Sequence, residues 1–569
     1  MSTSRNDPAN VMTGEGTRVR SRNILFLLAG LAVGALVTSG LALATMQLIE
    51  GDGGGQAAGA PNFSEETAVA GVEHVYDGEF QYFVGGGVAS FDCDDNGLPD
   101  LYFAGGSRPA ALFRNDSSVG GELRFSKLSD PLTDVDGVTG AYPLDVDSDG
   151  VTDLAVLRVG ENLMLRGLGD CRFERANEIW EVDGGNEWTA SFSATWEGDA
   201  TLPTLAFGNY LDIPEEGQRA EGCSDHYLFR PDDSGYGTPE RLTPGFCTLS
   251  ILFSDWSRSG QRDLRMTNDR HYYRDGEEQL WRIEEGEPPG LYTRADGWQQ
   301  TRIWGMGIAS HDVDGDGLPE VFLTSQGDNK LQTLVDGPDS PTYEDMALAS
   351  GATAHRPFTG DTTRPSTAWH AEFEDINNDG FMDLFITKGN VDAVPEFAME
   401  DPNNLLLGQP DGTFVEGAGD AGLADMGRSR GAAVVDLNLD GLLDVVVVDR
   451  RENVKLWRNL GQESDGDGES TGNWLAVDIK QPGANLDAIG SWIEVQHNDG
   501  IIRREVTVGG GHAGGQIGWI HFGLGRASDV GVRVVWPDGE AGPWMGVDAN
   551  RFIVVERSEA AYREWSPAG

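Results

Sequence analysis

The sequence Asp436-Leu-Asn-Leu-Asp-Gly-Leu-Leu-Asp444 is followed directly by the four valines 445–448. Oxygen-bearing side chains stand at positions 1, 3, 5 and 9 of this nine-residue stretch, and glycine stands at position 6. Because the glycine permits a sharp turn, these side chains can converge on one centre, and position 7 can add a backbone carbonyl. An oxygen-rich shell of this kind is what Ca²⁺ prefers, so the stretch is predicted to be a calcium-binding loop that leads into a β-strand.

The same pattern occurs at residues 92–100, 145–153, 312–320 and 375–383, each time before a β-rich run. An EF-hand would need Glu at position 12, but that position is apolar in all five stretches. The loops are therefore predicted to lie between strands and to hold about five Ca²⁺ ions as the only cofactor, with acidic turns that bind no metal as the alternative. The expected ligands, at positions 1, 3, 5, 7 and 9, are Asp92, Asp94, Asn96, Leu98 and Asp100; Asp145, Asp147, Asp149, Val151 and Asp153; Asp312, Asp314, Asp316, Leu318 and Glu320; Asp375, Asn377, Asp379, Phe381 and Asp383; Asp436, Asn438, Asp440, Leu442 and Asp444.

The spacing of the loops indicates repeats of one kind. Neighbouring loops start 53 to 63 residues apart, except for a gap of 167 residues that holds two degenerate units, at 191–204 and 250–263. These repeats, all β in character, predict an all-β fold, a seven-bladed β-propeller over residues 63–460. A small residue recurs five positions before most loops, and His370 is the exception; the small residues are Gly87, Gly140, Ser191, Ser250, Gly307 and Gly431.

The last repeat lacks the outer-strand signature that the others carry, because Gly461 runs into a Gly- and acid-rich segment. The missing signature stands at the other end of the repeats, in residues 63–71. We therefore expect residues 63–72 to supply the outer strand of the last blade, which would close the ring and leave no open sheet edge.

Composition excludes several classes of partner. The chain has 569 residues and a formal net charge of −52, which disfavours nucleic acid and anionic lipid surfaces. It is 39% hydrophobic and contains 15 Trp, as expected of a folded protein. The four cysteines form no metal-binding pattern; Cys223 and Cys247 are the expected disulfide in an oxidising compartment, with free thiols as the alternative, and a bond between Cys93 and Cys171 is left open.

The amino terminus predicts export. Residues 24–48 form a charge-free apolar run after three arginines in residues 18–22, long enough to cross a membrane and keep residues 1–23 in the cytoplasm. Two interpretations are open: an uncleaved transmembrane anchor in the inner membrane, or a signal sequence cleaved near Ala44 that leaves a secreted protein. Either places the rest of the chain outside the cytoplasm, in the periplasm or at the cell surface. Residues 49–62 are predicted to be a flexible tether.

The loop residues resemble the FG-GAP/VCBS repeats of integrin α-subunit propellers and of many exported bacterial proteins. The tail resembles the ASPIC/UnbV domain on the stretches NWLAVDI (473–479), NLDAIG (485–490), HFGLG (521–525) and VVWPDG (534–539). The order of the two resembles the cartilage acidic protein family, and the resemblance implies Ca²⁺ in the five intact loops only. The glycine run 509–515 departs from the bulkier turn expected of that family.

The tail's own residues predict a small β domain over 473–557, with strands at 474–480, 491–497, 501–508 and 531–536. A linker (461–472) precedes it, and a short tail (558–569) follows. The glycine run opens no helical pattern, so it is not predicted to cradle a phosphate.

No catalytic motif is recognisable in the sequence, and no catalytic residue is predicted. His512, His521 and His311 are the remaining candidate bases, of which His311 is expected to pack beside its loop. Arg428 and Arg430 stand just before a blade; solvated surface is their expected place, and the central mouth of the propeller is the alternative.

Three functions remain open. The first is a non-catalytic, calcium-binding scaffold for adhesion to, or binding of, a protein or glycan. The second is an assembly or structural factor of the cell envelope whose tail docks another protein. The third is a polysaccharide-acting or redox enzyme that uses a central pocket.

Overall fold

The computed structural model describes residues 57–213, 222–232, 235–269, 275–353, 364–391, 397–462, 471–497 and 500–567. The predicted anchor or signal sequence and the acidic linker at 463–470 lie outside these residues. Among the described residues no helix has the length and apolar character needed to cross a membrane. The all-β prediction is confirmed: the described α-helices are single turns, α2 (Thr67–Ala70), α3 (Ala347–Ser350) and α4 (Ala418–Ala421).

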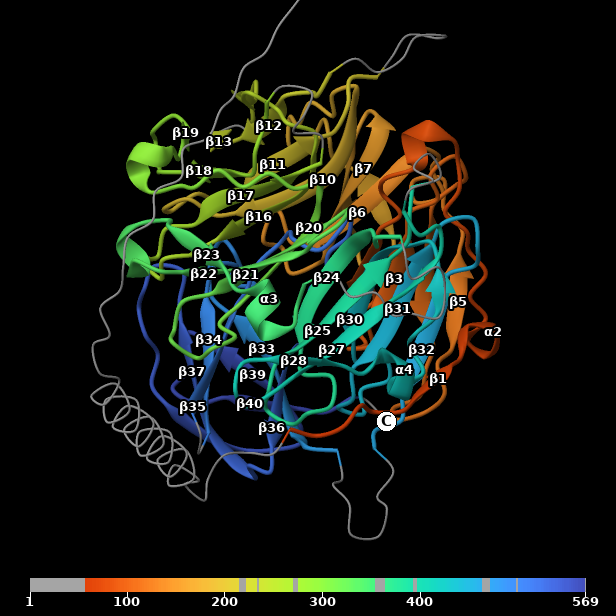
Figure 1. Cartoon of the computed structure of the whole chain (residues 1–569), viewed down its shortest axis with the longest axis vertical. Helices are drawn as coiled ribbons and strands as arrows, with labels where there is room; N and C mark the ends of the chain where they lie inside the picture. The colour runs from red at the N-terminus through yellow and green to blue at the C-terminus, as the bar shows by residue number, and fades with distance from the viewer. Residues whose placement is uncertain are drawn as a thin grey trace, which may run out of the picture. The chain divides into compact units, whose positions relative to one another are not determined.

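Antiparallel groups of four strands follow one another along the chain (Figure 1). The first groups are β2 (Val88–Phe91), β3 (Asp100–Phe103), β4 (Ala111–Asn115) and β5 (Phe125–Leu128); β6 (Val138–Leu144), β7 (Asp153–Gly160), β8 (Leu163–Gly167) and β9 (Phe173–Arg175); and β10 (Glu187–Thr195), β11 (Thr204–Asn209), β12 (His226–Phe229) and β15 (Glu240–Leu242). The next are β16 (Thr248–Ser254), β17 (Asp263–Asn268), β18 (Gln279–Arg282) and β19 (Gly290–Leu291); and β20 (Gly305–His311), β21 (Glu320–Ser325), β22 (Lys330–Leu334) and β23 (Tyr343–Asp345). The last are β24 (Ala368–Glu374), β25 (Asp383–Lys388), β27 (Asn404–Gly408) and β28 (Phe414–Glu416); and β30 (Ser429–Val435), β31 (Asp444–Asp449), β32 (Lys455–Asn459) and β1 (Phe63–Glu65).

The ring closes as the sequence predicts. β1 pairs with β32 in the register Phe63↔Asn459, so the first described strand completes the last group. The innermost strands contact one another in the cyclic order β2, β6, β10, β16, β20, β24, β30 and back to β2. A two-residue pairing between β7 and β10 also links the second and third groups.

Each predicted loop is the turn between the first two strands of its group. The residue before position 1 pairs with the residue at position 9, as in Phe91↔Asp100, Leu144↔Asp153 and Val435↔Asp444. The hairpin register therefore brings the two ends of every loop together before any side chain contributes.

The carboxy-terminal domain consists of two sheets. One contains β33 (Asn473–Lys480), β36 (Ile520–Gly525), β39 (Arg551–Glu556) and β40 (Arg563–Trp565); the other contains β34 (Trp492–His497), β35 (Gly500–Glu505), β37 (Asp529–Val535) and β38 (Met545–Asp548). Leu475, Ile493 and Val532 lie in the core between them. The strand predicted at 501–508 ends earlier, at Glu505. The segment predicted to be a plain tail contains β40, which pairs with β39 in the register Phe552↔Trp565.

Residues 508–516, which we call the strap, leave this domain and run through the middle of the ring. Isolated β-bridges join the strap to five of the innermost strands: Ser90↔Gln516, Ala141↔Gly514, Ala194↔Val508, Leu252↔Gly509 and Ile308↔Gly511. The amides of Gly510 and Gly511 donate to carbonyls of Ile251 and Ile308. The strap thus lies in the axial channel of the ring and connects the carboxy-terminal domain to the innermost strands.

The strap explains two of the recurring small residues before the loops, Gly87 and Gly140. A Cβ added at Gly87 or Gly140 would lie 1.7 or 1.9 Å from the carbonyl oxygen of Ala513. A Cβ at Gly514 would lie 2.1 Å from the Val88 oxygen. Neither side of this contact has room for a side chain, so glycine is required by close backbone approach and not by the fold of a single blade.

The four cysteines form two disulfides. Cys223–Cys247 is the predicted pair, and Cys93–Cys171 joins the first loop to the turn before β9. The second bond links two neighbouring groups of strands across 78 residues of sequence.

Part of the predicted tether is fixed to the ring. Ala58 N donates to Asp379 Oδ2 at 2.7 Å, and Asn62 N donates to Gly461 O at 2.9 Å. Residues 58–62 therefore lie against the ring, which corrects the prediction of a free tether up to residue 62; residues 49–56 of it lie outside the described part.

Candidate functional site

The five intact loops share one hydrogen-bonded frame. The carboxylate at position 1 accepts the amide of the position-6 glycine at 2.6 to 3.2 Å. In four loops it also accepts the amide at position 5, for example Asp440 N to Asp436 Oδ1 at 3.1 Å. The side chain at position 5 in turn accepts the amide at position 7 at 2.7 to 3.0 Å. This frame fixes the turn and turns the acidic side chains toward its inside.

The carboxylate at position 9 also has a structural role, which the spacing of the acids did not predict: it accepts hydrogen bonds from its loop and its sheet. Asp100 accepts amides from Cys93 and from Asn115 on β4, at 2.8 and 2.7 Å. Asp153, Asp383 and Asp444 make the same pair of contacts with their own loop and with the third strand of their group. Glu320 accepts the Val313 amide and the Thr333 hydroxyl instead. Position 9 therefore ties each loop to its sheet.

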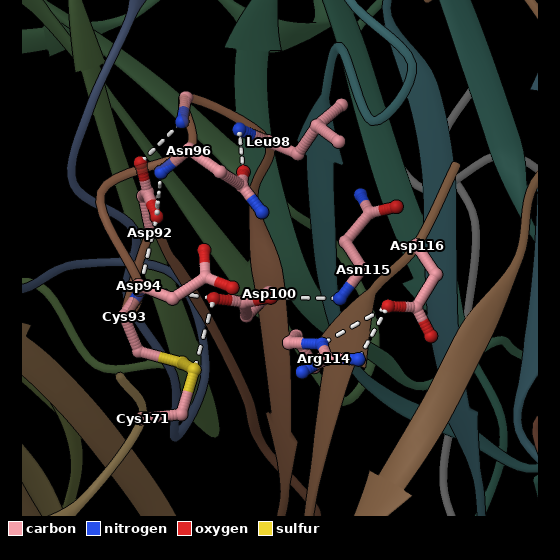
Figure 2. The surroundings of a disulfide bond; sticks show 11 residues. Asp92, Cys93, Asp94, Asn96, Leu98, Asp100, Arg114, Asn115, Asp116 and Cys171 are labelled. Carbon is pink, nitrogen blue, oxygen red and sulfur yellow. Dashed lines mark hydrogen bonds and ion pairs between the residues drawn. A yellow bond between two sulfur atoms is a disulfide. The ribbon is translucent and has the colours of Figure 1, made fainter. Parts of the chain in front are cut away.

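The acids converge in three of the loops. Carboxylate oxygens lie within 4.8 Å of one another in the sets Asp92, Asp94, Asp100; Asp145, Asp147, Asp153; and Asp312, Asp314, Asp316. Figure 2 shows the first set around the turn, with Asn96 above and the disulfide below. The loops at 375 and 436 carry Asn at position 3, so fewer carboxylates meet there.

Several of these oxygens have no partner. The Oδ1 atoms of Asp94, Asp147 and Asn438, all at position 3, are buried and have no hydrogen-bond partner among the described residues. A buried acceptor without a donor is costly, and a cation would satisfy it. The donor set, consisting of carboxylate and amide oxygens, is the set that Ca²⁺ takes.

Burial and like charge disfavour ionisation of these carboxyls. Burial, with smaller contributions from neighbouring acids, raises the pKa of Asp100, Asp153 and Asp436 to about 8. The pKa values of Asp375, Asp383 and Asp444 are raised well above the ordinary value for the same reasons. A divalent cation would reverse this effect because it favours the charged form.

Protein groups occupy some of the oxygens. Arg166 binds Asp147 and Asp149, each at 2.6 Å. Arg503 of the carboxy-terminal domain binds Asp312 at 2.9 Å. Arginine side chains therefore compete for ligand carboxylates in the loops at 145 and 312.

One degenerate loop keeps the frame without the ligands. Asp255 accepts the amides of Ser259 and Gly260 at 2.8 and 2.9 Å, as position 1 does in the intact loops. Serines stand at positions 3 and 5, and Glu505 of the carboxy-terminal domain accepts the Asp255 amide at 2.8 Å. The other degenerate turn, residues 196–203, has no such frame in the sequence.

The carboxy-terminal domain lies directly against the loops. A Cβ at Gly97 would meet Trp565 at 2.4 Å, and one at Gly441 would meet Trp474 at 1.9 Å. His521 Nε2 contacts Asn378 Oδ1 at 2.6 Å. The loop face is therefore an intramolecular interface as well as a candidate metal site.

The remaining candidate residues His311, His512 and Arg430 are buried. His311 is buried beside Phe373, at 6.1 Å between ring centroids, and His512 lies in the channel. The prediction that Arg430 lies on solvated surface is wrong. Its side chain is fully buried, donates to the Phe83 oxygen at 2.9 Å and stacks on Trp369. Backbone carbonyls of Phe83, Ser429 and Asn390 and the ring of Trp369 surround the guanidinium in place of water.

Comparison with known proteins agrees with these features. The FG-GAP-like repeat family matches residues 312–386 and 375–447, and the ASPIC and UnbV family matches residues 481–561. The chain contains FG-GAP-like repeats and a carboxy-terminal ASPIC and UnbV domain. The matched repeats contain three of the five loops, and the ASPIC and UnbV match contains the whole strap. None of the curated proteins compared with the chain matches it.

Solved structures resemble the chain only in fold. The amino-terminal part of BBS1 in complex with ARL6 has 9% identity and a TM-score of 0.39, and covers 72% of this chain and 97% of its own. A lectin of Agrocybe aegerita that recognises non-reducing terminal N-acetylglucosamine has 14% identity and a TM-score of 0.38, with 68% and 94% covered. The Dos1 propeller has 10% identity and a TM-score of 0.31, with 71% and 95% covered. At these values the likeness carries no argument about function.

Proposed function

We propose that this protein is an exported, calcium-stabilised, seven-bladed β-propeller that acts as a non-catalytic binding or adhesion scaffold. The cyclic order of the innermost strands supports the blade number. The partner would be a protein or a glycan, and an anchor at residues 24–48 would hold the scaffold at the outer side of the inner membrane. In this proposal Ca²⁺ is bound by positions 1, 3, 5 and 9 of the five loops.

The observation that carries the calcium proposal is the partnerless position-3 oxygen inside a shared frame. It recurs at Asp94, Asp147 and Asn438, which belong to three different blades. When bound, the cation would neutralise the converging carboxylates and link the loop to the strand that follows. The glycine at position 6 would allow the turn, and the carboxylate at position 9 would connect the loop to its sheet through hydrogen bonds.

The scaffold would present its ligand surface away from the loop face. The carboxy-terminal domain covers that face through Trp474, His521 and Trp565. The same contacts count against the alternative in which the tail is a free module that docks another protein. The outer strands and the opposite mouth of the ring remain for partners, as is usual for sites built on rigid scaffolds.

The test is thermal unfolding with millimolar Ca²⁺ or with EGTA. A ligand that binds only the folded state at about 100 times its Kd stabilises by about 2.7 kcal/mol per site, so chelation should lower Tm by several degrees. D94N should lose part of this shift and one equivalent of bound Ca²⁺. D95N is the matched control, because Asp95 stands at position 4 of the same loop and its removal changes the charge equally. An unchanged Tm in EGTA would contradict the proposal.

A further inference from the structure

The strap is held in the channel by two histidines. His512 is fully buried; its Nδ1 lies 3.1 Å from the Met306 oxygen, and the amide of Gly85 donates to its Nε2 at 3.3 Å. Because an N–H already points at Nε2, the ring proton must be on Nδ1. The seated strap therefore accommodates only a neutral imidazole.

His370 is held in the same way. The backbone amide of His512 donates to His370 Nδ1 at 3.1 Å, and His370 Nε2 lies 3.2 Å from Glu372 Oε2. The ring therefore donates to Glu372 and accepts from the strap. A second proton on Nδ1 would face the His512 N–H and remove this contact. This explains why His370 interrupts the series of small channel residues: it is the side chain that grips the strap.

Glu372 connects the other end of the strap to the same network. It accepts the side-chain amide of Gln516, and the Val434 amide at 3.1 Å. Two points of the strap, at 512 and 516, thus depend on one short segment of β24. A substitution of His370 should therefore weaken the contacts of the strap at residue 512 and at residue 516.

The charged groups around the two rings differ in sign. His512 faces Arg430 of β30, whose guanidinium lies 4.0 Å from the Trp369 ring, and His370 of β24; Gly85 and Met306 face it with backbone only. Glu372 faces His370 and is itself next to Glu374 and Arg504. Burial, with smaller contributions from Arg430 and His370, lowers the pKa of His512 to about 3, although the hydrogen bond with the Met306 carbonyl acts in the opposite direction.

We propose that His370 and His512 form a proton-sensitive latch, which holds the strap in the axial channel at neutral pH and releases it in mild acid. Released from the channel, the imidazole of His512 titrates near its ordinary pKa of 6.5, whereas the seated one stays neutral. The seat is therefore stable above about pH 6.5 and loses stability as the pH falls below it, by up to tenfold per pH unit. Release would open the channel and the adjoining cavity of about 810 Å³.

The test is hydrogen–deuterium exchange of the full chain between pH 7.5 and 5.0, corrected for the intrinsic rate at each pH. The amides of Gly510 and Gly511 are hydrogen-bonded to the ring, so the strap peptide should be protected at pH 7.5. Its protection should fall at least tenfold by pH 5.0, while a peptide from the buried strand β7 keeps its protection. A strap that stays equally protected, or that loses protection only together with β7, overturns the proposal.

Variants separate the latch from general acid sensitivity. The double variant H370N/H512Q keeps polar side chains of similar reach without a titrating ring, and its strap protection should not depend on pH. H226Q is the matched control, since His226 is also fully buried but lies on β12, away from the strap. The single variants H370A and H512Q cover the case in which the double variant does not fold. H512Q should reduce the steepness of the pH dependence by about one proton, and H370A, which removes the acceptor of the His512 amide, should lower the protection of the strap at pH 7.5. Wild-type steepness in H512Q, or wild-type protection in H370A, would overturn the latch.

Discussion

Two loops of the ring can be compared residue by residue: 92–100 and 255–263. In both, the first Asp accepts the amide of the glycine at position 6, at 2.6 Å from Gly97 and 2.9 Å from Gly260. In both, the Asp at position 9 accepts an amide at the end of the third strand: that of Asn115, the last residue of β4, in one, and that of Ile283, directly after β18, in the other.

The two loops differ at positions 3 and 5. The loop at 92 has Asp94 and Asn96, with one Asp94 oxygen lacking a partner, whereas the loop at 255 has Ser257 and Ser259. Positions 1, 6 and 9 therefore stabilise the hairpin in both loops. Only the loop at 92 has, at positions 3 and 5, the carboxylate and amide oxygens that a cation would need. Acids at 1 and 9 alone are therefore no evidence for metal.

The largest expected effect concerns the shared frame. D100A should leave two buried amides without an acceptor, and D263A should strand the Ile283 amide and the Trp256 indole N–H. Each should cost about 3 kcal/mol of the free energy of unfolding, measured by urea denaturation in EGTA. If D100A were harmful and D263A neutral, the frame would not be common to both loops.

A smaller effect is expected from converting one loop into the other. The hydroxyl oxygens of Ser257 and Ser259 lie 2.9 Å apart, so side chains at these positions already converge. S257D/S259D should therefore add one equivalent of bound Ca²⁺ and stabilise the protein in calcium by about 1 to 3 kcal/mol. S257A/S259A serves as the control. Equal calcium stoichiometry in both variants, measured by equilibrium dialysis, would show that Glu505 or another neighbour blocks the site.

The smallest effect concerns protons at the intact loops. Since burial raises the pKa of Asp100, Asp153 and Asp436 to about 8, these calcium-free carboxyls hold protons at pH 7. Calcium must displace the protons, so binding should release a fraction of a proton per site and tighten as the pH rises from 7 to 9. Calorimetry at pH 7 in two buffers of different ionisation enthalpy measures this release. A buffer-independent enthalpy would mean that the carboxyls are already ionised.

Much of the fold could be predicted because it repeats. Five copies of one loop gave the hairpins, and the displaced signature at Phe63 gave the pairing of β1 with β32. The strap could not be predicted, since its contacts join residues such as Gly140 and Ala513 that no local pattern connects. The small residues before the loops were the available signal, but the sequence does not show which segment of the chain approaches them. Burial of Arg430 was missed for the same reason.

At the candidate site the sequence predicted the convergence of acids but not what competes for them. Arg166 and Arg503 reach loop carboxylates from a neighbouring strand and from another domain. The spacing of charged residues does not show which cation a folded chain will bring to an acid. Position 9 likewise carries a structural role that a ligand pattern cannot distinguish.

The pairing of Phe63 with Asn459 has a consequence for the order in which the protein can be made. A chain that leaves the ribosome amino terminus first exposes β1 long before its partner β32 exists. Contacts between such distant segments form late and slowly. The unfinished ring therefore carries a strand edge that must stay unpaired through most of synthesis, when a neighbouring chain is the nearest alternative partner.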